Sequence, residues 1–323
     1  PCIAPADCMQ SEAGRLGGMK RDFPLWPQRD LLRTGSMNAP SVLLLIPAYN
    51  EEARIGPTLR QYAAHVRDHY PGRFEIVAVV NGCRDNTLEV VQGVAREFSN
   101  IRWLVIPERV GKGGALIEGL RLAPEADVIG YADADAATAP ASLLELAARC
   151  QDYDCAVGSR RVSGATIHQS QPSHRQLASK VFHFIVELLF GMGIRDTQCG
   201  AKFLRQQMAL KIQDRLLIAD MAFDVNLLYA VKRAGGTLIE APVDWTDHLG
   251  STVSYFRTSL VMFLSVVRLR LVYSPFYPWL RPLRPVEAWI YGALRNPPPL
   301  SGPLPPRSAT PRRDIEQGSA SDH

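Results

Sequence analysis

The sequence contains no hydrophobic run that would suggest a membrane-spanning helix, which needs roughly 18 or more consecutive apolar residues. Residues 1–40 also lack the apolar stretch of a signal peptide. Two shorter apolar stretches occur, at 181–194 and 259–273; charged residues interrupt the first and close the second. Each is typical either of a buried core helix or of a helix that lies in a membrane interface, and no membrane span is predicted.

Several common site patterns are also missing. The six cysteines form no C-x-x-C pair, which in a chain of 323 residues favours a reducing compartment over a disulfide framework or a zinc site. No G-x-G-x-x-G follows the first predicted strand, and this disfavours a dehydrogenase. The glycines around Lys112 lack the G-x-x-x-x-G-K-[ST] spacing, which excludes a P-loop ATPase. No internal repeat is visible.

Charge is unevenly distributed along the chain. The net charge is +4, but residues 256–323 hold nine arginines, no lysine and four acids, a net of +5. Such a basic end suits an anionic surface such as a membrane or a nucleic acid, or it is a solvated tail. Residues 1–40 are expected to form a loose arm, with Met37 a candidate true start, and the Pro-rich residues from about 296 on are expected to be disordered.

Between these ends the pattern alternates strand and helix. The first apolar run is continuous rather than alternating, as parallel strands buried on both faces require. Strands alternating with helices predict βαβ units, hence an α/β fold with a mostly parallel sheet sandwiched by helices. The expected strands are 41–49, 74–82, 101–107, 126–135 and 153–160, and the expected helices are 50–70, 85–98, 111–123 and 140–150.

Two aspartates, Asp133 and Asp135, follow the fourth of these strands. Aspartates at a strand end commonly stabilise a turn, but paired carboxylates also suit a hard cation such as Mg²⁺, whose remaining ligands come from substrate phosphates. Other polar residues follow neighbouring strands, and ligands of parallel sheets bind beyond the carboxyl ends of the strands. This convergence favours a metal site that holds Mg²⁺ or Mn²⁺.

Seven segments occur in the order seen in family 2 glycosyltransferases of the GT-A (Rossmann-like) fold. The set resembles the dolichyl- or polyprenyl-phosphate sugar transferases, and 195–203 is most similar to their dolichyl-phosphate β-glucosyltransferase branch. The resemblance covers residues 41–256. The segments are "VLLLIPAYNEEARI" (42–55), "VVNGCRDNT" (79–87), "RVGKGGALIEG" (109–119), "YADADAAT" (131–138), "VGSR" (157–160), "RDTQCGAKF" (195–203) and "IEAPVDW" (239–245).

The resemblance implies an inverting enzyme that moves a hexose, with glucose favoured, from a nucleotide sugar to a polyprenyl phosphate. UDP-glucose is the favoured donor and GDP-mannose the alternative. Asn81 stands where many relatives carry an aspartate that faces the base, and this departure leaves the identity of the base open. The metal contact falls more firmly on Asp135, with Asp133 reaching the ribose or the ion. The implied donor site comprises Pro47, Ala48, Tyr49, Glu51, Asn81, Lys112, Asp133, Ala134 and Asp135.

On the acceptor side, Arg160 and Arg175 match the arginines that bind the acceptor phosphate in this family. A phosphate monoester has a second pKa of about 6, so it is already a nucleophile and needs no general base. An acceptor with a hydroxyl group would need one, and Asp220 and Asp224 are the candidates, although either suits a helix cap equally well. The candidates for sugar hydroxyls are Asp196, Gln198 and Asp224, and Lys202 and His248 are weaker candidates for the acceptor phosphate.

The resemblance also implies peripheral contact with the cytoplasmic face of a membrane and no nucleic-acid partner. The expected organisation is a loose arm at 1–40, a catalytic domain at 41–256, an interfacial helical segment at 257–295 and a Pro-rich basic tail at 296–323. A non-catalytic protein that binds nucleotide sugar is a further alternative, which the intact aspartate pair disfavours.

Overall fold

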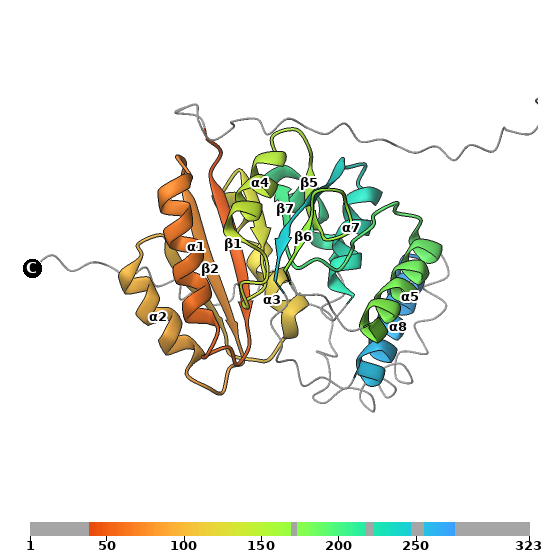
Figure 1. Ribbon diagram of the computed structural model, residues 1–323, viewed down its shortest axis with the longest axis horizontal. Coiled ribbons are helices and arrows are strands. Elements are labelled where there is room, and N and C mark those ends of the chain that lie inside the picture. Colours follow the sequence, from red (N-terminus) through yellow and green to blue (C-terminus); the bar gives the residue numbers. More distant parts are fainter. Residues whose placement is uncertain (1–38, 169–172, 217–221, 247–254, 275–323) are drawn as a thin grey trace, which may run out of the picture. The chain divides into compact units, whose positions relative to one another are not determined.

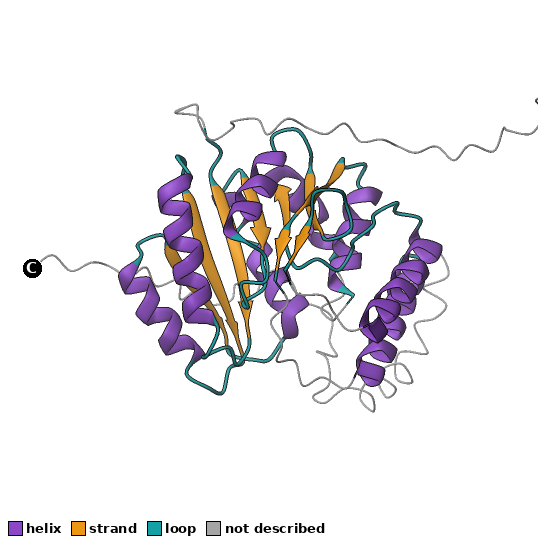
Figure 2. Cartoon of the chain, viewed as in Figure 1, coloured by secondary structure: helices purple, strands orange, loops and turns teal. Residues whose placement is uncertain are grey.

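The computed structural model describes residues 39–168, 173–216, 222–246 and 255–274, with the backbone alone at 173–178 and 255–260. A central sheet with helices on both faces is its main feature (Figures 1 and 2). The α/β architecture predicted from the sequence is thus confirmed. Within the described ranges, none of the helices is both long and apolar enough to span a membrane.

The sheet has seven strands in the order β3-β2-β1-β4-β7-β5-β8. All neighbouring pairs are parallel except those of β7, which runs antiparallel to both β4 and β5. A small second sheet pairs β6 with β9. The strands are β1 Val42–Ala48, β2 Phe74–Asn81, β3 Ile101–Ile106, β4 Val128–Tyr131, β5 Cys155–Ser159, β6 Thr166–Ile167, β7 Lys202–Arg205, β8 Leu238–Pro242 and β9 Asp244–Trp245.

Two hydrophobic cores lie on opposite faces of this sheet because successive strand residues point to opposite sides. Leu43 and Leu45 of β1 pack into the core beneath α3, α6 and α7. Leu44 and Ile46 pack into the core beneath α1, α2 and α4. The helices are α1 Ile55–His69, α2 Thr87–Glu97, α3 Gly111–Leu120, α4 Pro140–Arg149, α5 Ser173–Phe190, α6 Gln206–Ile212, α7 Phe223–Arg233 and α8 Tyr255–Val272, with 3-10 turns at Ala123–Glu125 and Gln213–Arg215.

Two predicted elements differ most from their expected bounds, and both differ at the edge where β1, β2 and β4 finish, here called the carboxyl edge. Helix α1 begins at Ile55 rather than at 50, because Asn50 accepts a hydrogen bond from the backbone of Arg84 (2.9 Å). Strand β4 stops at Tyr131 rather than at 135. The chain beyond it is held by α1 instead, since Thr58 Oγ1 donates to the Ala134 carbonyl (2.8 Å).

The two apolar stretches fall on α5 and α8, which lie side by side at one flank of the sheet (Figure 1). One side of each helix is buried, as shown by Val186 of α5 and Val266 of α8. The other side of α5 exposes Val181, Phe184 and Leu188, with 51%, 65% and 73% of each residue open to solvent. Both helices therefore pack against the core, and α5 also exposes an apolar side; whether this side lies in a membrane interface stays a prediction.

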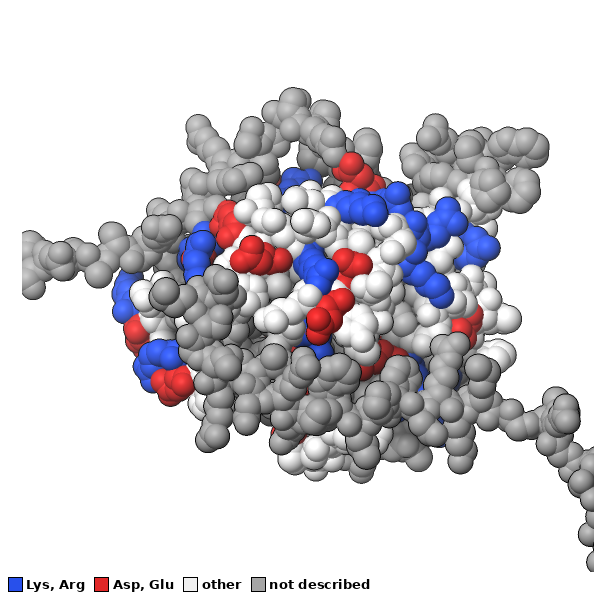
Figure 3. Space-filling model, turned by 90° about the horizontal axis from the view of Figure 1, so that it is seen from above, with Lys and Arg blue, Asp and Glu red and all other residues white. Residues whose placement is uncertain are grey.

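The opposite edge of the sheet, where the parallel strands begin, carries ion pairs. Arg102 contacts Glu75 (2.7 Å) and Glu125 (2.8 Å), and Arg73 contacts Glu75 (2.5 Å). Seen from above, acidic and basic residues lie interspersed over the left and centre of the visible surface, while basic residues gather toward the right (Figure 3). Ion pairs of this kind are typical of a solvated surface.

Candidate active site

The register of the sheet brings the predicted donor residues together. Ala48 of β1 pairs with Val80 of β2, and Leu45 pairs with Tyr131 at the end of β4. The segments that follow these three strands therefore start at one edge, as the sequence predicts for a parallel sheet. Pro47 and Ala48 belong to β1 itself, so their backbone shapes this edge.

Asn81 is buried at the end of β2, and its amide orientation is set by a neighbour. Its Nδ2 donates to the Ala48 carbonyl (2.9 Å), whereas its Oδ1 is buried without a hydrogen-bond partner among the described atoms. Buried polar atoms normally have partners. The orphan atom is an acceptor, the same kind of atom that an aspartate would place at this position.

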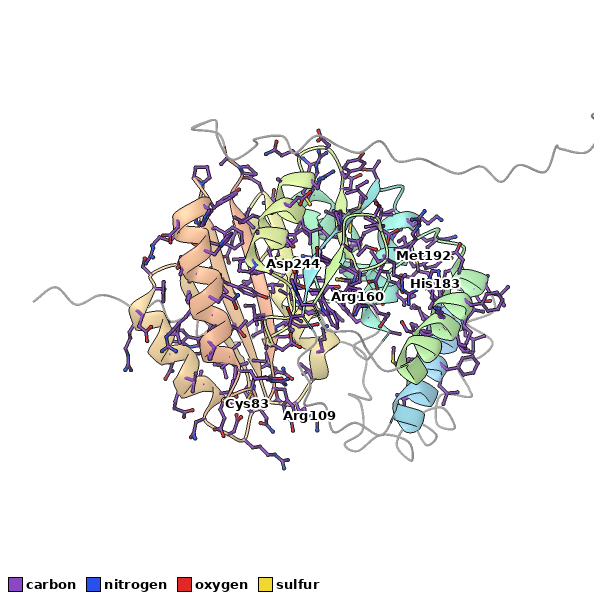
Figure 4. The ribbon with its side chains drawn as sticks, in the orientation of Figure 1. Cys83, Arg109, Arg160, His183, Met192 and Asp244 are labelled. Carbon is purple, nitrogen blue, oxygen red and sulfur yellow. The ribbon has the colours of Figure 1, made fainter. Side chains whose placement is uncertain are left out.

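Arg109 is a residue of this edge that the sequence analysis did not single out, although it lies in the quoted segment 109–119. Its guanidinium carbon lies 4.1 Å from the centre of the Tyr49 ring. Gly82 leaves room for the backbone of Arg109. The Gly82 φ is +57°, and a Cβ there would lie 2.5 Å from the Arg109 backbone nitrogen. Figure 4 shows Arg109 beside Cys83, whose sulfur accepts from the Asn50 nitrogen (3.4 Å).

Glu51, the last of the predicted base and ribose residues after β1, also lies at this edge. Its backbone nitrogen donates to Thr87 Oγ1 (2.8 Å), which ties the end of β1 to the start of α2. Its carboxylate forms a two-bond ion pair with Arg54 (both bonds 2.7 Å). Glu51 therefore orders the loop, and its contact with the nucleotide stays a prediction.

The aspartate pair follows β4 in an alternating pattern. Ala134 is buried between the two aspartates. Asp135 Oδ1 accepts from the backbone nitrogen of Ala137 (3.1 Å), and Ala136 between them has a φ of +55°, a left-handed conformation that is uncommon outside glycine and clusters at functional sites. Asp133 contacts the ammonium of Lys112, from the first turn of α3.

These two carboxylates suit a divalent cation. They are hard oxygen donors on one short turn, and 38% of the Asp133 side chain is exposed. No cluster of three or more His, Cys, Asp or Glu side chains is found among the described residues. A cation held by Asp133 and Asp135 would therefore draw its other ligands from phosphate oxygens and water, which is the usual arrangement for Mg²⁺.

Gly200 is a second residue that the sequence analysis did not single out. A Cβ at this position would lie 1.9 Å from Asp133 Oδ2 and 2.6 Å from its carboxyl carbon. Any larger residue must push the Asp133 carboxylate aside. Gly200 and Asp133 are 67 positions apart, so no local pattern links them; the glycine in "CGAKF" is the one available signal.

We expect Gly200→Ala to lower the transfer rate about 100-fold, since a misplacement of about 1 Å in a catalytic group can cost that much. The matched control is Gly93→Ala in α2, where a Cβ meets nothing within 4 Å and alanine should stabilise the helix by about 0.5–1 kcal/mol. Steady-state rates and melting temperatures of both variants check this. Normal activity of a folded Gly200→Ala variant would contradict the role given to Gly200.

A buried cluster of charged and polar side chains lies next to the carboxyl edge. Lys202 is fully buried; its ammonium donates to Asp224 Oδ1 (2.5 Å) and to the Cys199 carbonyl (2.6 Å). The Tyr131 hydroxyl donates to the same Asp224 oxygen (2.5 Å). Burial raises the pKa of the Asp224 carboxyl, but Lys202 and Lys112 nearby outweigh it and hold this pKa below its ordinary value. Asp224 is therefore an ionised anchor rather than a poised base.

Arg160, which the sequence analysis assigned to the acceptor phosphate, directly follows β5. Its Nε and Nη2 donate to the two oxygens of Asp196 (2.8 and 2.9 Å), and its backbone nitrogen donates to the same carboxylate (3.0 Å). The guanidinium carbon lies 5.1 Å from the Trp245 ring centre. Burial raises the pKa of Asp196, yet the bonds from Arg160 hold it below its ordinary value.

The roles predicted for several other site residues stay predictions. Both oxygens of Asp196 are engaged by Arg160, and Gln198 carries a buried Nε2 with no partner among the described atoms; their contacts with sugar hydroxyls stay predictions. Arg175 lies in the first turn of α5, but its side chain lies outside the described residues. Asp220 and His248 also lie outside them.

The strand order, the antiparallel β7 and the aspartate pair after β4 together define a glycosyltransferase of the GT-A fold, as predicted. A model described as glycosyl transferase family 2 matches residues 43–212, more than half of the chain. The chain therefore belongs to glycosyltransferase family 2 and is a glycosyltransferase.

Named relatives agree with this assignment. The chain is 32% identical over 240 residues to the dolichyl-phosphate β-glucosyltransferase of Drosophila melanogaster, covering 70% of this chain and 73% of that protein. It is 31% identical over 230 residues to glycosyltransferase AglD of Haloferax volcanii, covering 70% of this chain. The chain spans about a third of AglD, with 36% of that protein aligned.

The fold also matches solved structures. Glucosyl-3-phosphoglycerate synthase from Mycobacterium tuberculosis, in complex with Mn²⁺, UDP-glucose and phosphoglyceric acid, has a TM-score of 0.56 with this chain. The two are 14% identical, and the match covers 72% of this chain and 80% of that one. At this identity the likeness concerns the fold alone.

Proposed function

We propose that this protein transfers glucose, with inversion, from UDP-glucose to a polyprenyl phosphate of the dolichyl type. The observation that carries the proposal is the state of the carboxylates around the site. Asp196 is bound by Arg160, and Asp224 by Lys202 and Tyr131, so neither is available to take a proton from a hydroxyl group. An acceptor that is already an anion needs no such base, and the relatives named for dolichyl phosphate point the same way.

The orphan oxygen of Asn81 supports a uracil base. Uracil presents one N–H group between two carbonyls, so a single acceptor atom matches it. Guanine presents neighbouring N–H groups on its ring and on its exocyclic nitrogen, which call for two acceptors side by side. Asn81 has one, because its Nδ2 is committed to Ala48. This difference favours UDP-glucose over GDP-mannose as the donor.

Asp133 and Asp135 are the residues that would hold Mg²⁺ or Mn²⁺. When bound, such an ion acts as a Lewis acid that neutralises the charge of the departing diphosphate. The chain contributes the fixed geometry: Ala137 orients Asp135, and Gly200 leaves space for the Asp133 carboxylate.

Arg160 would position the acceptor. Asp196 engages its Nε and Nη2, so the fork is held rigid while Nη1 takes no part in that ion pair. An arginine fixed in this way binds phosphate oxygens with defined geometry. One acceptor oxygen then attacks the anomeric carbon from the face opposite the leaving group. The bond to the diphosphate oxygen breaks, and the nucleoside diphosphate departs with the electron pair; no proton is transferred.

The second candidate keeps the fold and changes the acceptor to a saccharide or an alcohol. It requires a general base, and Asp224 is poorly suited because its pKa is held low and its carboxylate is nearly buried. Asp220 is the other candidate.

A panel of nucleotide sugars with a short polyprenyl phosphate and Mg²⁺ or Mn²⁺ tests the proposal. We expect UDP-glucose to give the fastest transfer and the product to be the β-glucosyl lipid phosphate. Preference for GDP-mannose would refute the donor assignment. Transfer to alcohols at a rate matching that with the lipid phosphate would refute the acceptor assignment.

We further infer that α5 and α8 bind the cytoplasmic face of a membrane. Val181, Phe184 and Leu188 are spaced three and four residues apart, so they form one exposed apolar stripe on α5. On the neighbouring α8, Phe263 and Leu271 are also exposed, and Arg270 directly precedes Leu271. Apolar residues flanked by cations suit a helix that lies in the membrane interface.

We expect the protein to sediment with anionic vesicles and to be released by salt, since each cation near such a surface is worth about 1 kcal/mol. Phe184→Ser with Leu188→Ser should abolish most of this binding. The matched control is Leu210→Ser, an exposed leucine of α6 that is 43% open to solvent, which should bind as before. A truncated variant should lack only residues after 274, so that α8 is kept, because Val266 and Leu269 of α8 belong to the hydrophobic core. Unchanged sedimentation of the α5 double variant would refute the membrane role of this face.

A further inference from the structure

Lys112 and Asp133 form an ion pair at the point where the divalent cation is expected. The Lys112 ammonium contacts Asp133 Oδ1, and 38% of each side chain is exposed. The other oxygen of Asp133 faces Gly200. One of the two carboxylates assigned to the metal is therefore already neutralised by a cation of the chain itself.

The two cations compete for the same carboxylate. A divalent ion bound to Asp133 would lie within a few ångströms of the Lys112 ammonium, and like charges this close repel each other. Asp135 is in a different situation, because its described hydrogen bond comes from the Ala137 backbone and not from a cation. Binding of the metal alone must therefore displace Lys112 from Asp133.

Lys112 has freedom to move, but the two other described carboxylates that attract it, Asp224 and Asp135, are not open to it. The four-carbon stem of Lys112 rotates easily, and this residue is partly exposed. Asp135 is the second ligand assigned to the metal. Asp224 attracts Lys112 and, with Asp133, raises the pKa of Lys112 against the effect of burial. However, Asp224 is already bonded to Lys202 and Tyr131. The remaining destination is an anion that arrives from outside, and the donor diphosphate is such an anion.

We propose that Lys112 is a built-in counter-ion of Asp133 that exchanges places with the divalent cation when the donor binds. This inference rests on the proposed function. Without nucleotide, Lys112 holds Asp133 and keeps metal affinity low; with nucleotide, its ammonium moves to a diphosphate oxygen and frees Asp133 for the metal. The exchange makes metal and nucleotide bind cooperatively, and it keeps the aspartate pair ordered while the site is empty.

The test is calorimetric titration of the full chain with Mn²⁺, in the absence and presence of UDP. We expect Lys112→Gln to bind Mn²⁺ alone about tenfold more tightly than the wild type, and UDP to improve Mn²⁺ binding about tenfold less in this variant. Lys112→Arg keeps the charge and should resemble the wild type in Mn²⁺ binding. Lys180→Gln, which removes an exposed lysine of α5, controls for net charge and should leave both titrations unchanged.

Two outcomes separate this inference from the proposed function. If Mn²⁺ binds the wild type and is lost in Asp135→Asn, but Lys112→Gln binds it no more tightly than the wild type, the exchange is refuted and the metal site stands. If the wild type binds no Mn²⁺ even with UDP, the metal assignment is refuted and the exchange with it. Melting temperatures verify that each variant is folded.

Discussion

Asp135→Asn is expected to abolish transfer while the fold stays intact. A neutral amide binds a hard cation poorly, and loss of a preorganised electrostatic contact to the leaving group typically costs 100- to 1,000-fold in rate. The one described hydrogen bond of the Asp135 side chain comes from the Ala137 nitrogen (3.1 Å), and an asparagine oxygen can accept it equally well. The rate should therefore fall about 1,000-fold with a melting temperature close to that of the wild type.

Asp152→Asn is the matched control, because Asp152 is an exposed aspartate in the turn between α4 and β5. It changes the net charge by the same amount and should leave the rate unchanged. Chelation of divalent cations by EDTA should mimic Asp135→Asn, and Mn²⁺ or Mg²⁺ should restore the wild type but not the variant. Full activity of the wild type in EDTA, or an active Asp135→Asn variant, would remove the metal from the mechanism.

The position of this aspartate pair could be predicted from the sequence because it depends on local pattern and topology together. The uninterrupted apolar run of β1 indicates a strand buried on both faces. Once the sheet is parallel, residues that follow β1, β2 and β4 must meet at one edge. The structure confirms this through the pairing of Ala48 with Val80 and of Leu45 with Tyr131.

The antiparallel strand β7 could not be predicted in the same way. Its four residues, Lys202–Arg205, are too few to show a period, and they follow α5 after a stretch of irregular chain. Strand direction here depends on tertiary pairing: Tyr131 of β4 lies opposite Lys202, and Ala156 of β5 lies opposite Phe203. Gly130 of β4 is part of the reason that this arrangement fits, since a Cβ there would lie 2.2 Å from the Phe203 ring.

Contacts between distant segments account for the remaining differences at the site. Arg160 and Asp196 were both assigned to the site from the sequence, but their pairing requires β5 and the segment before β7 to lie together. The start of α1 was misplaced because the side chain of Asn50 is bound by the loop that precedes α2. Such partners are 34 or more positions apart, beyond the range of any helical or strand period.

The second large loss of rate is expected from substitution of Arg160, which we propose positions the acceptor. Arg160→Ala should lower the rate with polyprenyl phosphate by about 30- to 1,000-fold, which corresponds to about 2–4 kcal/mol of transition-state stabilisation. UDP binding should scarcely change, since the nucleotide residues follow β1, β2 and β4. Removing the guanidinium also leaves Asp196, which is 2% exposed, as a buried charge without its partner, and such a loss destabilises a protein by about 3–5 kcal/mol.

Arg160→Lys separates the two effects. Lysine keeps the charge beside Asp196 but lacks the planar fork, so we expect a melting temperature nearer to the wild type and only partial recovery of the rate. If stability alone governed activity, the rate of Arg160→Lys would recover together with its melting temperature.

Asp224→Asn discriminates between the phosphate and hydroxyl acceptors. The substitution leaves the fully buried Lys202 without its counter-charge, so the variant should be less stable, and its rate must be normalised to the folded fraction by UDP titration. So normalised, it should retain a substantial rate with polyprenyl phosphate, because no side chain takes a proton. The pH dependence should then follow the ionisation of the acceptor, near pH 6, in wild type and variant alike. If folded Asp224→Asn is inactive while Arg160→Ala stays active, Asp224 is the base, the acceptor is a hydroxyl, and the lipid-phosphate assignment is wrong.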